Sequence, residues 1–248
     1  MKRFLLTLLF VSVSLFAEEI RIAAAANVSY AVADLKREFA KSHPDTKITV
    51  TVGSSGKLAA QIKNGAPYGI FLSADMRYPH RLYEEGIAVT EPTVYARGLL
   101  VYFSVKPRDF STGMALLERA SVRTIAVANP KTAPYGAAAA EAMKKAGLYE
   151  KVKRKLVYGE SVSQTVSYVL KAADIGLVAK SALYGPQMSG YREGVNWAEV
   201  DRKLYRPIKQ GAVLLERGRK SPGCSAFYRF LFSDKAKRVF KKYGYITE

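Results

Sequence analysis

The sequence predicts an α/β fold of two lobes, each with a mainly parallel sheet flanked by helices. Apolar strand-like runs alternate with segments of helical periodicity along the chain, a pattern typical of parallel sheets covered on both faces. Four polar turns fall where a strand should lead into a helix. Residues 18–248 are numerous enough for one large domain or two small ones, and they contain no internal repeat or low-complexity linker.

The N-terminal third shows the alternation most clearly. Residues 20–26 form a compact apolar run suited to a buried strand, and apolar residues then recur at helical spacing from Val28 until Pro44 ends the helix. The predicted order continues with a strand at 47–52, a helix at 55–63, a strand at 68–73 and a helix at 76–85.

The remainder of the chain predicts more elements of the same kind. Two terminal helices close it, the second with Ser233 as its N-cap. Open α/β sheets bind ligands beyond the carboxyl ends of their strands, so a site is expected in the turns that follow strands. The predicted strands are 99–105, 122–128, 175–179 and 211–216, and the predicted helices are 136–146, 162–171, 222–232 and 234–243.

Residues 1–17 are predicted to be a secretory signal. Lys2 and Arg3 give a basic start, an apolar stretch follows over 4–16, and Ala17 offers a small residue for cleavage. The stretch is too short to span a bilayer, although an uncleaved anchor is the alternative. No cysteine follows it, which closes the lipoprotein route. We therefore expect a soluble periplasmic protein.

The composition narrows the classes of partner and site. The formal net charge is +18, and removal of Lys2 and Arg3 with the signal leaves +16, a balance that attracts anions. The basic residues are scattered, without a basic arm that has interleaved aromatics, so we expect a solvated basic surface and no nucleic-acid partner. Cys224 is the only cysteine, which excludes an internal disulfide and a Cys-based metal site.

Four turns carry the strongest functional signal. Each offers hydroxyls, amides or bare N–H groups at the expected start of a helix, where unpaired N–H groups and the positive end of the helix dipole can hold an anion. Taken singly, Asn27, Ser55 and Ser161 are also typical of ordinary N-caps, and Tyr135 of a packed turn. The turns are residues 24–29, 53–58, 133–136 and 159–164.

Five motifs give the chain a family resemblance. They are Ala-Ala-Ala-Asn-Val-Ser at 24–29, Gly-Ser-Ser-Gly-Lys-Leu-Ala at 53–59, Phe-Leu-Ser-Ala-Asp at 71–75, Pro-Tyr-Gly at 134–136 and Phe-Lys-Lys-Tyr-Gly-Tyr at 240–245. In this order they resemble the periplasmic molybdate-binding proteins of ABC importers, across essentially all of residues 18–248. The resemblance implies a periplasmic-binding-protein fold of type II, a clamshell whose lobes close on an oxyanion.

The same resemblance implies lobe limits, a ligand and partners. Lobe I would comprise residues 18–98 plus 207–248 and lobe II residues 99–206, with hinges near 97–98 and 206–207. The ligand would be molybdate, with tungstate as a second ligand of nearly the same size and charge. A monomer without cofactor or enzymatic activity would deliver it to an inner-membrane ABC permease. Molybdenum would be bound only as its oxyanion, so no direct metal ligand is expected.

The residues expected to bind the oxyanion are Asn27 and Ser55 from one lobe and Tyr135 and Val162 from the other. A tetrahedral dianion offers only acceptors, and the Asn27 amide, the Ser55 and Tyr135 hydroxyls and the four backbone N–H groups supply donors. Many family members have Ser in place of Asn27, a small residue in place of Tyr135 and Tyr in place of Ala179. We therefore expect the Tyr135 hydroxyl to replace the phenol absent at position 179.

Two alternatives remain open. A binding protein of the same architecture could take sulfate or another oxyanion, whereas an organic carboxylate would favour an Arg that the four turns lack. A serine hydrolase built on Ser54 or Ser55 is the less favoured alternative. The surrounding sequence is not Gly-x-Ser-x-Gly, and neither His43 nor His80 follows a predicted strand. No Arg or Lys is needed in the cavity, and we expect Lys57 to face solvent.

Overall fold

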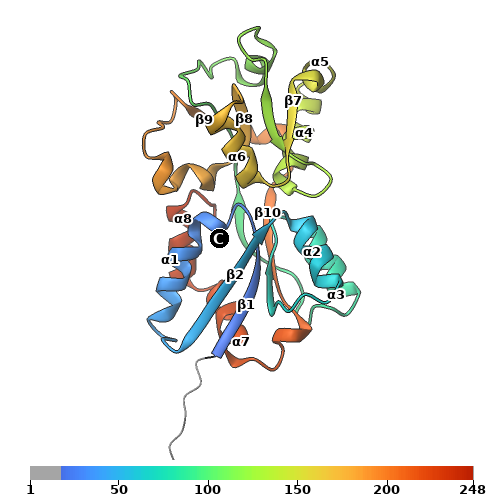
Figure 1. Ribbon diagram of the computed structural model, residues 1–248, viewed down its shortest axis with the longest axis vertical. Coiled ribbons are helices and arrows are strands. Elements are labelled where there is room, and N and C mark those ends of the chain that lie inside the picture. The colour runs from blue at the N-terminus through green and yellow to red at the C-terminus, as the bar shows by residue number, and fades with distance from the viewer. Residues whose placement is uncertain (1–17, 248) are drawn as a thin grey trace, which may run out of the picture.

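The computed structural model describes residues 18–247, which form two five-stranded sheets in separate lobes. Figure 1 shows the two lobes end to end, with β10 (Ile208–Leu214) starting at their junction and running into the lower lobe. The strand order is β2-β1-β3-β10-β4 in lobe I and β7-β6-β8-β5-β9 in lobe II. The predicted two-lobed α/β fold is therefore confirmed. The expected signal at 1–17 lies outside the described residues.

Lobe I is built around a sheet with one reversed strand. The first strand of the chain pairs in parallel with the second and third, and β10 runs antiparallel to both of its neighbours. The other strands are β1 (Glu18–Ala25), β2 (Thr46–Gly53), β3 (Ile70–Leu72) and β4 (Thr93–Gly98), and the helices are α1 (Ser29–Ala40), α2 (Ser55–Lys63), α3 (Arg77–Glu84), α7 (Pro222–Phe230) and α8 (Asp234–Lys242).

Lobe II repeats this plan. Its central strands pair in parallel, and the reversed strand again lies fourth in the sheet. The strands are β5 (Leu100–Phe103), β6 (Ile125–Ala128), β7 (Leu156–Gly159), β8 (Ile175–Ala179) and β9 (Trp197–Glu199), and the helices are α4 (Pro134–Lys145), α5 (Tyr149–Val152) and α6 (Val162–Lys171).

In each sheet, the reversed strand is the one that the chain forms immediately after it crosses from the other lobe. β5 begins two residues after β4 ends at Gly98, and β10 begins at Ile208, directly after Pro207. Two adjacent crossings of this kind allow two rigid lobes to rotate about a hinge. The lobe limits of 18–98 plus 207–248 and 99–206 stay a prediction.

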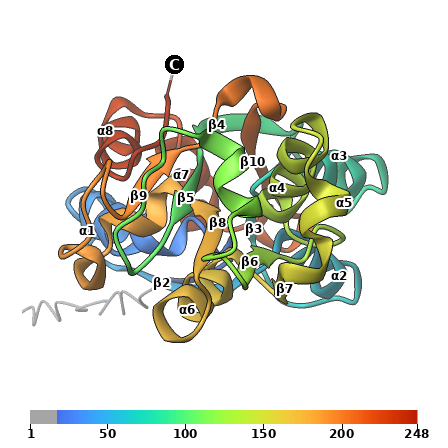
Figure 2. The same cartoon turned by 90° about the horizontal axis from the view of Figure 1, so that it is seen from above.

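Helices cover both faces of the lobe I sheet. Leu58 and Leu82, from α2 and α3, pack with Phe71 of β3 on one face. On the other face Phe39 of α1 packs against Phe227 of α7, with ring centroids 5.1 Å apart. Figure 2 shows these two helical layers on opposite sides of the lobe. Each such side chain, when fully buried, contributes about 1.5–3 kcal/mol, so the layers hold the strand ends in fixed positions.

The sequence predicted most elements and missed several short ones. The limits of α2, α6 and β8 are as predicted, and the strand predicted at 68–73 is only Ile70–Leu72. The strands β4, β7 and β9 were not predicted. In residues 18–247, no helix combines the length and the apolar character needed to cross a bilayer.

Candidate functional site

All four polar turns lead from a strand or its following loop into a helix, and they meet between the lobes. Their meeting point is a cavity of about 10 Å³ that contains all four expected ligand-binding residues. Among the described residues, no charged side chain lines it. The lining residues are Ala25, Ala26, Asn27, Ser54, Ser55, Ala74, Ala133, Pro134, Tyr135 and Val162.

Ser55 offers a hydroxyl and an N–H to this cavity. It is the first residue of α2 and is fully buried. Its Oγ accepts a hydrogen bond of 2.9 Å from the N–H of Ala74. Because the Oγ is already used as an acceptor there, its proton remains available for donation to a ligand.

Asn27 has a different role from the one its amide suggests. The two N–H bonds of its side-chain amide are both used inside lobe I, since Nδ2 donates to Gln210 Oε1 and to Tyr245 Oη, each at 2.8 Å. Asn27 is also not the N-cap of α1, because that position belongs to Val28. The donor that Asn27 can offer to the cavity is its backbone N–H.

Tyr135 brings its backbone to the cavity and its hydroxyl to the crossing strands. A Cβ added to Gly98 would collide with the Tyr135 hydroxyl and lie 2.9 Å from Gln210 Nε2, so this hydroxyl lies at the β4–β5 junction. Among the described residues no partner lies in good hydrogen-bond geometry to this hydroxyl. Burial raises the pKa of Tyr135 well above 10, although the nearby Asn27 side chain lowers it slightly, so the side chain stays neutral in any physiological medium. Its expected substitution for a phenol at Ala179 stays a prediction.

Val162 supplies only backbone, at the first position of α6. Ser161 precedes it as a true N-cap, with its Oγ accepting from the N–H of Gln164 at 3.3 Å. The cap satisfies a deeper N–H of the helix and leaves that of Val162 free. Ser161 is thus the N-cap that the sequence offered as its alternative role, and the binding of an oxyanion by the Val162 N–H stays a prediction.

The four backbone N–H groups share one property. No hydrogen bond within residues 18–247 uses the N–H of Asn27, Ser55, Tyr135 or Val162. Three of them lie in the first turns of helices, where no intrahelical acceptor exists and the dipole is positive. With the Ser55 hydroxyl, the cavity therefore gathers five uncharged donors from both lobes, and we call it the donor cavity.

The lobes also contact each other directly beside this cavity. The N–H of Gly56 donates to the carbonyl of Thr132 at 2.9 Å. Ser54 Oγ donates to Glu160 Oε1 at 3.1 Å, and Lys57 Nζ lies 3.9 Å from the same oxygen. The Lys57 side chain is 56 % exposed, so it lies at the rim. These contacts were not predicted from the sequence, because each joins residues far apart in the chain.

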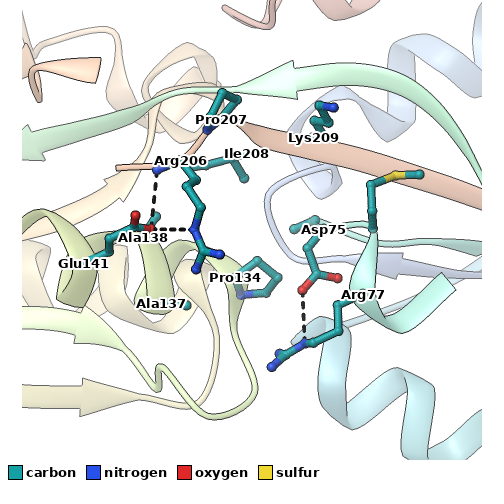
Figure 3. Close-up of a pocket in the computed structure, with 12 residues that line it drawn as sticks. Asp75, Arg77, Pro134, Ala137, Ala138, Glu141, Arg206, Pro207, Ile208 and Lys209 are labelled. Atoms are coloured by element: carbon teal, nitrogen blue, oxygen red, sulfur yellow. Dashed lines mark hydrogen bonds and ion pairs between the residues drawn. The ribbon is translucent and has the colours of Figure 1, made fainter. Parts of the chain in front are cut away.

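A second, larger pocket lies next to the cavity and shares Ala74 and Pro134 with it. Its volume is about 320 Å³, and Figure 3 shows charged side chains of both signs around it. Arg206 Nε lies 3.3 Å from Glu141, and Arg77 Nε lies 3.6 Å from Asp75. The two carboxylates of this pocket would repel a dianion, and they already form ion pairs with two of its cationic side chains. This pocket therefore suits an oxyanion less well than the donor cavity.

The histidines do not assemble a catalytic site with these serines. His43 stacks on Phe39, with ring centroids 4.2 Å apart, and its Nδ1 lies 2.9 Å from Ser42 Oγ. His80 lies on the surface of α3. Among the described residues no group of three His, Cys, Asp or Glu side chains could hold a metal ion.

Comparison with known proteins agrees with this geometry. Residues 20–246 match the family described as bacterial extracellular solute-binding protein. The chain belongs to this family. The molybdate-binding protein ModA of Azotobacter vinelandii is 39 % identical over 233 residues, which cover 92 % of this chain and 90 % of that protein. ModA of Rhodobacter capsulatus is 39 % identical over 234 residues, 94 % of this chain and 90 % of that protein.

Solved structures show the same fold. The periplasmic molybdate-binding protein of Azotobacter vinelandii superposes with a TM-score of 0.84 at 30 % identity, covering 92 % of this chain and 99 % of that one. The sulfate-binding protein SubI of Mycobacterium tuberculosis superposes with a TM-score of 0.74 at 12 % identity, over 92 % of this chain and 86 % of that one, which shows the fold alone. The family resemblance indicated by the five motifs is thus confirmed. The names of these relatives describe them as binding proteins.

Proposed function

We propose that this solute-binding protein captures molybdate, and equally tungstate, and delivers it to an inner-membrane ABC permease. The observation that carries the proposal is the set of five unpaired, uncharged donors that both lobes direct to one cavity. The names of the relatives, molybdate-binding proteins at 39 % identity, support the choice of ligand.

The donor set suits a fully deprotonated tetrahedral dianion. Hydrogen bonds to a charged group contribute roughly 1.5–3 kcal/mol each, so five would supply about 8–15 kcal/mol before ordering costs. That range is compatible with micromolar to nanomolar binding. Because Asn27 and Ser55 belong to lobe I and Tyr135 and Val162 to lobe II, the ligand stabilises the closed arrangement of the lobes through its contacts with both.

Selectivity follows from the same chemistry. Hydrogen phosphate carries a proton that requires an acceptor, and leaving it unpaired costs about 1–3 kcal/mol. Sulfate satisfies all donors but is smaller than molybdate, so its rejection depends on the fit of the closed lobes. A volume of 10 Å³ is close to that needed for one water molecule, so the lobes must close less tightly around an oxyanion than they do here.

The proposal places the protein in the periplasm as a freely soluble monomer. The relative from Azotobacter vinelandii is described as periplasmic, and residues 1–17 have the composition of a secretory signal. No cofactor, enzymatic activity or nucleic-acid partner enters the proposal, because binding and release of the oxyanion need only the donors and the hinge.

Isothermal titration of residues 18–248 tests the proposal with four sodium salts: molybdate, tungstate, sulfate and phosphate. We expect molybdate and tungstate to bind one-to-one with similar sub-micromolar Kd, and sulfate and phosphate to bind at least about 100-fold more weakly. Equal or tighter binding of sulfate would favour the sulfate-binding alternative. The absence of heat with all four anions would contradict an oxyanion site of any kind.

A further inference from the structure

The Asn27 side chain is held by residues that no ligand would touch. Gln210 of β10 and Tyr245, which ends the motif at 240–245, each accept one N–H of its amide at 2.8 Å. All three side chains are buried, with Gln210 fully so. We propose that Gln210 is a positioning residue, which orients Asn27 so that its backbone N–H, and not its amide, meets the oxyanion. This inference rests on the proposed function.

The orientation of Gln210 is fixed by backbone carbonyls. Its Nε2 donates to the carbonyl of Ile208 at 3.0 Å and lies 3.5 Å from the carbonyl of Ala74. Two carbonyl oxygens can be faced only by the NH₂ end of the amide, so Oε1 must face Asn27. Asn27 in turn must present Nδ2 to Gln210, which determines which way its own amide points.

The peptide groups around Asn27 are held as firmly as its side chain. Its carbonyl accepts from Tyr245 Oη and from Ser181 Oγ, each at 2.9 Å. The preceding carbonyl, that of Ala26, accepts from Ser29 Oγ at 2.7 Å and from Ser163 Oγ at 3.2 Å.

Two of these hydroxyls, those of Ser29 and Ser163, act on the peptide that carries the Asn27 N–H. Donors to the Ala26 carbonyl polarise the Ala26–Asn27 peptide and make its N–H a stronger donor. Ser163 lies on α6 and Ser181 lies two residues after the end of β8, so both belong to lobe II. Closure of the lobes therefore holds the Ala26–Asn27 peptide through Ser163 and the following peptide through Ser181, while Gln210 holds the Asn27 side chain from lobe I.

A double-mutant cycle tests the coupling between the two amides. We expect Asn27→Ala and Gln210→Leu each to weaken molybdate binding about 5- to 20-fold by titration calorimetry, and the double variant to bind no more weakly than the worse single one. If Asn27→Ala instead costs about tenfold or more in the Gln210→Leu background, the Asn27 amide contacts the oxyanion directly and the proposal is overturned.

The variant Gln210→Glu gives a second readout, the pH dependence of molybdate affinity, which would not change if Gln210 had a purely structural role. Its neutral acid can still donate to the Ile208 carbonyl, but its carboxylate cannot, and burial raises the pKa of such a group. We expect its affinity for molybdate to fall about tenfold or more at pH 8 relative to wild type and to recover toward pH 6. The titratable groups around this network are Tyr95, Tyr135, Tyr205 and Tyr245, whose pKa values burial raises, so wild-type affinity should be flat over this range.

Gln187→Glu, at an exposed position of lobe II, is the matched control and should behave as wild type. A Gln210→Glu variant whose affinity equals that of wild type at every pH would overturn the inference while leaving the proposed function intact. If the wild-type protein itself fails to bind molybdate, the proposed function fails first. Thermal unfolding of each variant shows whether it is folded, and the Gln210→Leu cycle keeps the test decisive should Gln210→Glu not fold.

Discussion

Two pockets lie side by side between the lobes, and they differ in volume and in the charge of their lining residues. The charged pocket has a volume of about 320 Å³ and is lined by Arg77, Arg206 and Lys209. The donor cavity has about 10 Å³ and, among the described residues, no charged lining. Volume and positive charge would both select the charged pocket.

The chemistry selects the donor cavity instead. In the charged pocket Asp75 and Glu141 face two of the cations, so the local charges already balance in part. In the donor cavity the N–H groups have no competing acceptor within the described residues. Dipoles that are fixed within each lobe and bring no counter-charge hold a dianion well in a water-excluded site. An unpaired donor is therefore a better guide to an anion site than a nearby cation.

The largest expected effect comes from Ser55→Ala, which removes a donor from the cavity. A hydrogen bond to a charged ligand is worth about 1.5–3 kcal/mol, so molybdate affinity should fall roughly 10- to 150-fold by titration calorimetry. Ser54→Ala is the matched comparison, because the Ser54 hydroxyl donates to Glu160 across the lobes and its loss should cost only the roughly threefold effect of that contact. If Ser55→Ala and wild type bind molybdate with comparable affinity, the donor cavity is not the anion-binding site.

Gly56→Ala tests closure without touching a ligand contact. Its Cβ would lie 3.1 Å from Thr132 Cα across the cleft and 2.5 Å from Tyr78 Oη. Overpacking of this kind costs about 1–3 kcal/mol, and the lower end applies because Tyr78 can shift. We expect stopped-flow fluorescence to show a five- to tenfold faster dissociation of molybdate at an unchanged association rate. Gly190→Ala, where a Cβ meets nothing within 4 Å, is the control.

Glu160→Ala probes the rim and should have a smaller effect. The variant loses the acceptor of Ser54 and the partner of Lys57, whose side chain is largely exposed. Partly exposed pairs contribute about 0.2–1 kcal/mol, so the dissociation rate should rise about threefold at low salt, with less change at high salt. A loss of 100-fold would mean that Glu160 belongs to the binding site itself.

The double variant Arg206→Gln with Lys209→Gln should have the smallest effect. It removes two cations of the charged pocket and leaves the donor cavity unchanged. We expect the Kd for molybdate to stay within about twofold of wild type, with a modest decrease of the association rate at low ionic strength only. A loss of tenfold or more in affinity would show that the charged pocket holds the anion.

The features of the fold that depend on local sequence pattern were predicted correctly. The limits of α2 and α6 follow from their periodicity and their polar starts, and the convergence of four helix N-termini follows from the topology of parallel strands. The missed strands have weak local signals. β7 and β9 have only four and three residues, and β4 contains Arg97 and has an exposed start at Thr93.

The hydrogen-bond partners of residues far apart in the chain could not be predicted from the local sequence pattern. The partners of the Asn27 amide, Gln210 and Tyr245, are 183 and 218 residues away in the chain. An asparagine at the start of a helix predicts a cap or a ligand contact, and neither periodicity nor spacing reveals a remote amide that uses its donors. The position of the Tyr135 hydroxyl likewise depends on Gly98, a contact that only the folded crossing strands create.

The most direct test of the account is a crystal structure with molybdate, with data collected at the molybdenum absorption edge. We predict a single strong anomalous peak in the donor cavity, with oxyanion oxygens 2.7–3.2 Å from the backbone nitrogens of Asn27, Ser55, Tyr135 and Val162, as hydrogen bonds require. A peak in the neighbouring pocket, beside Arg77 and Arg206, would contradict the account.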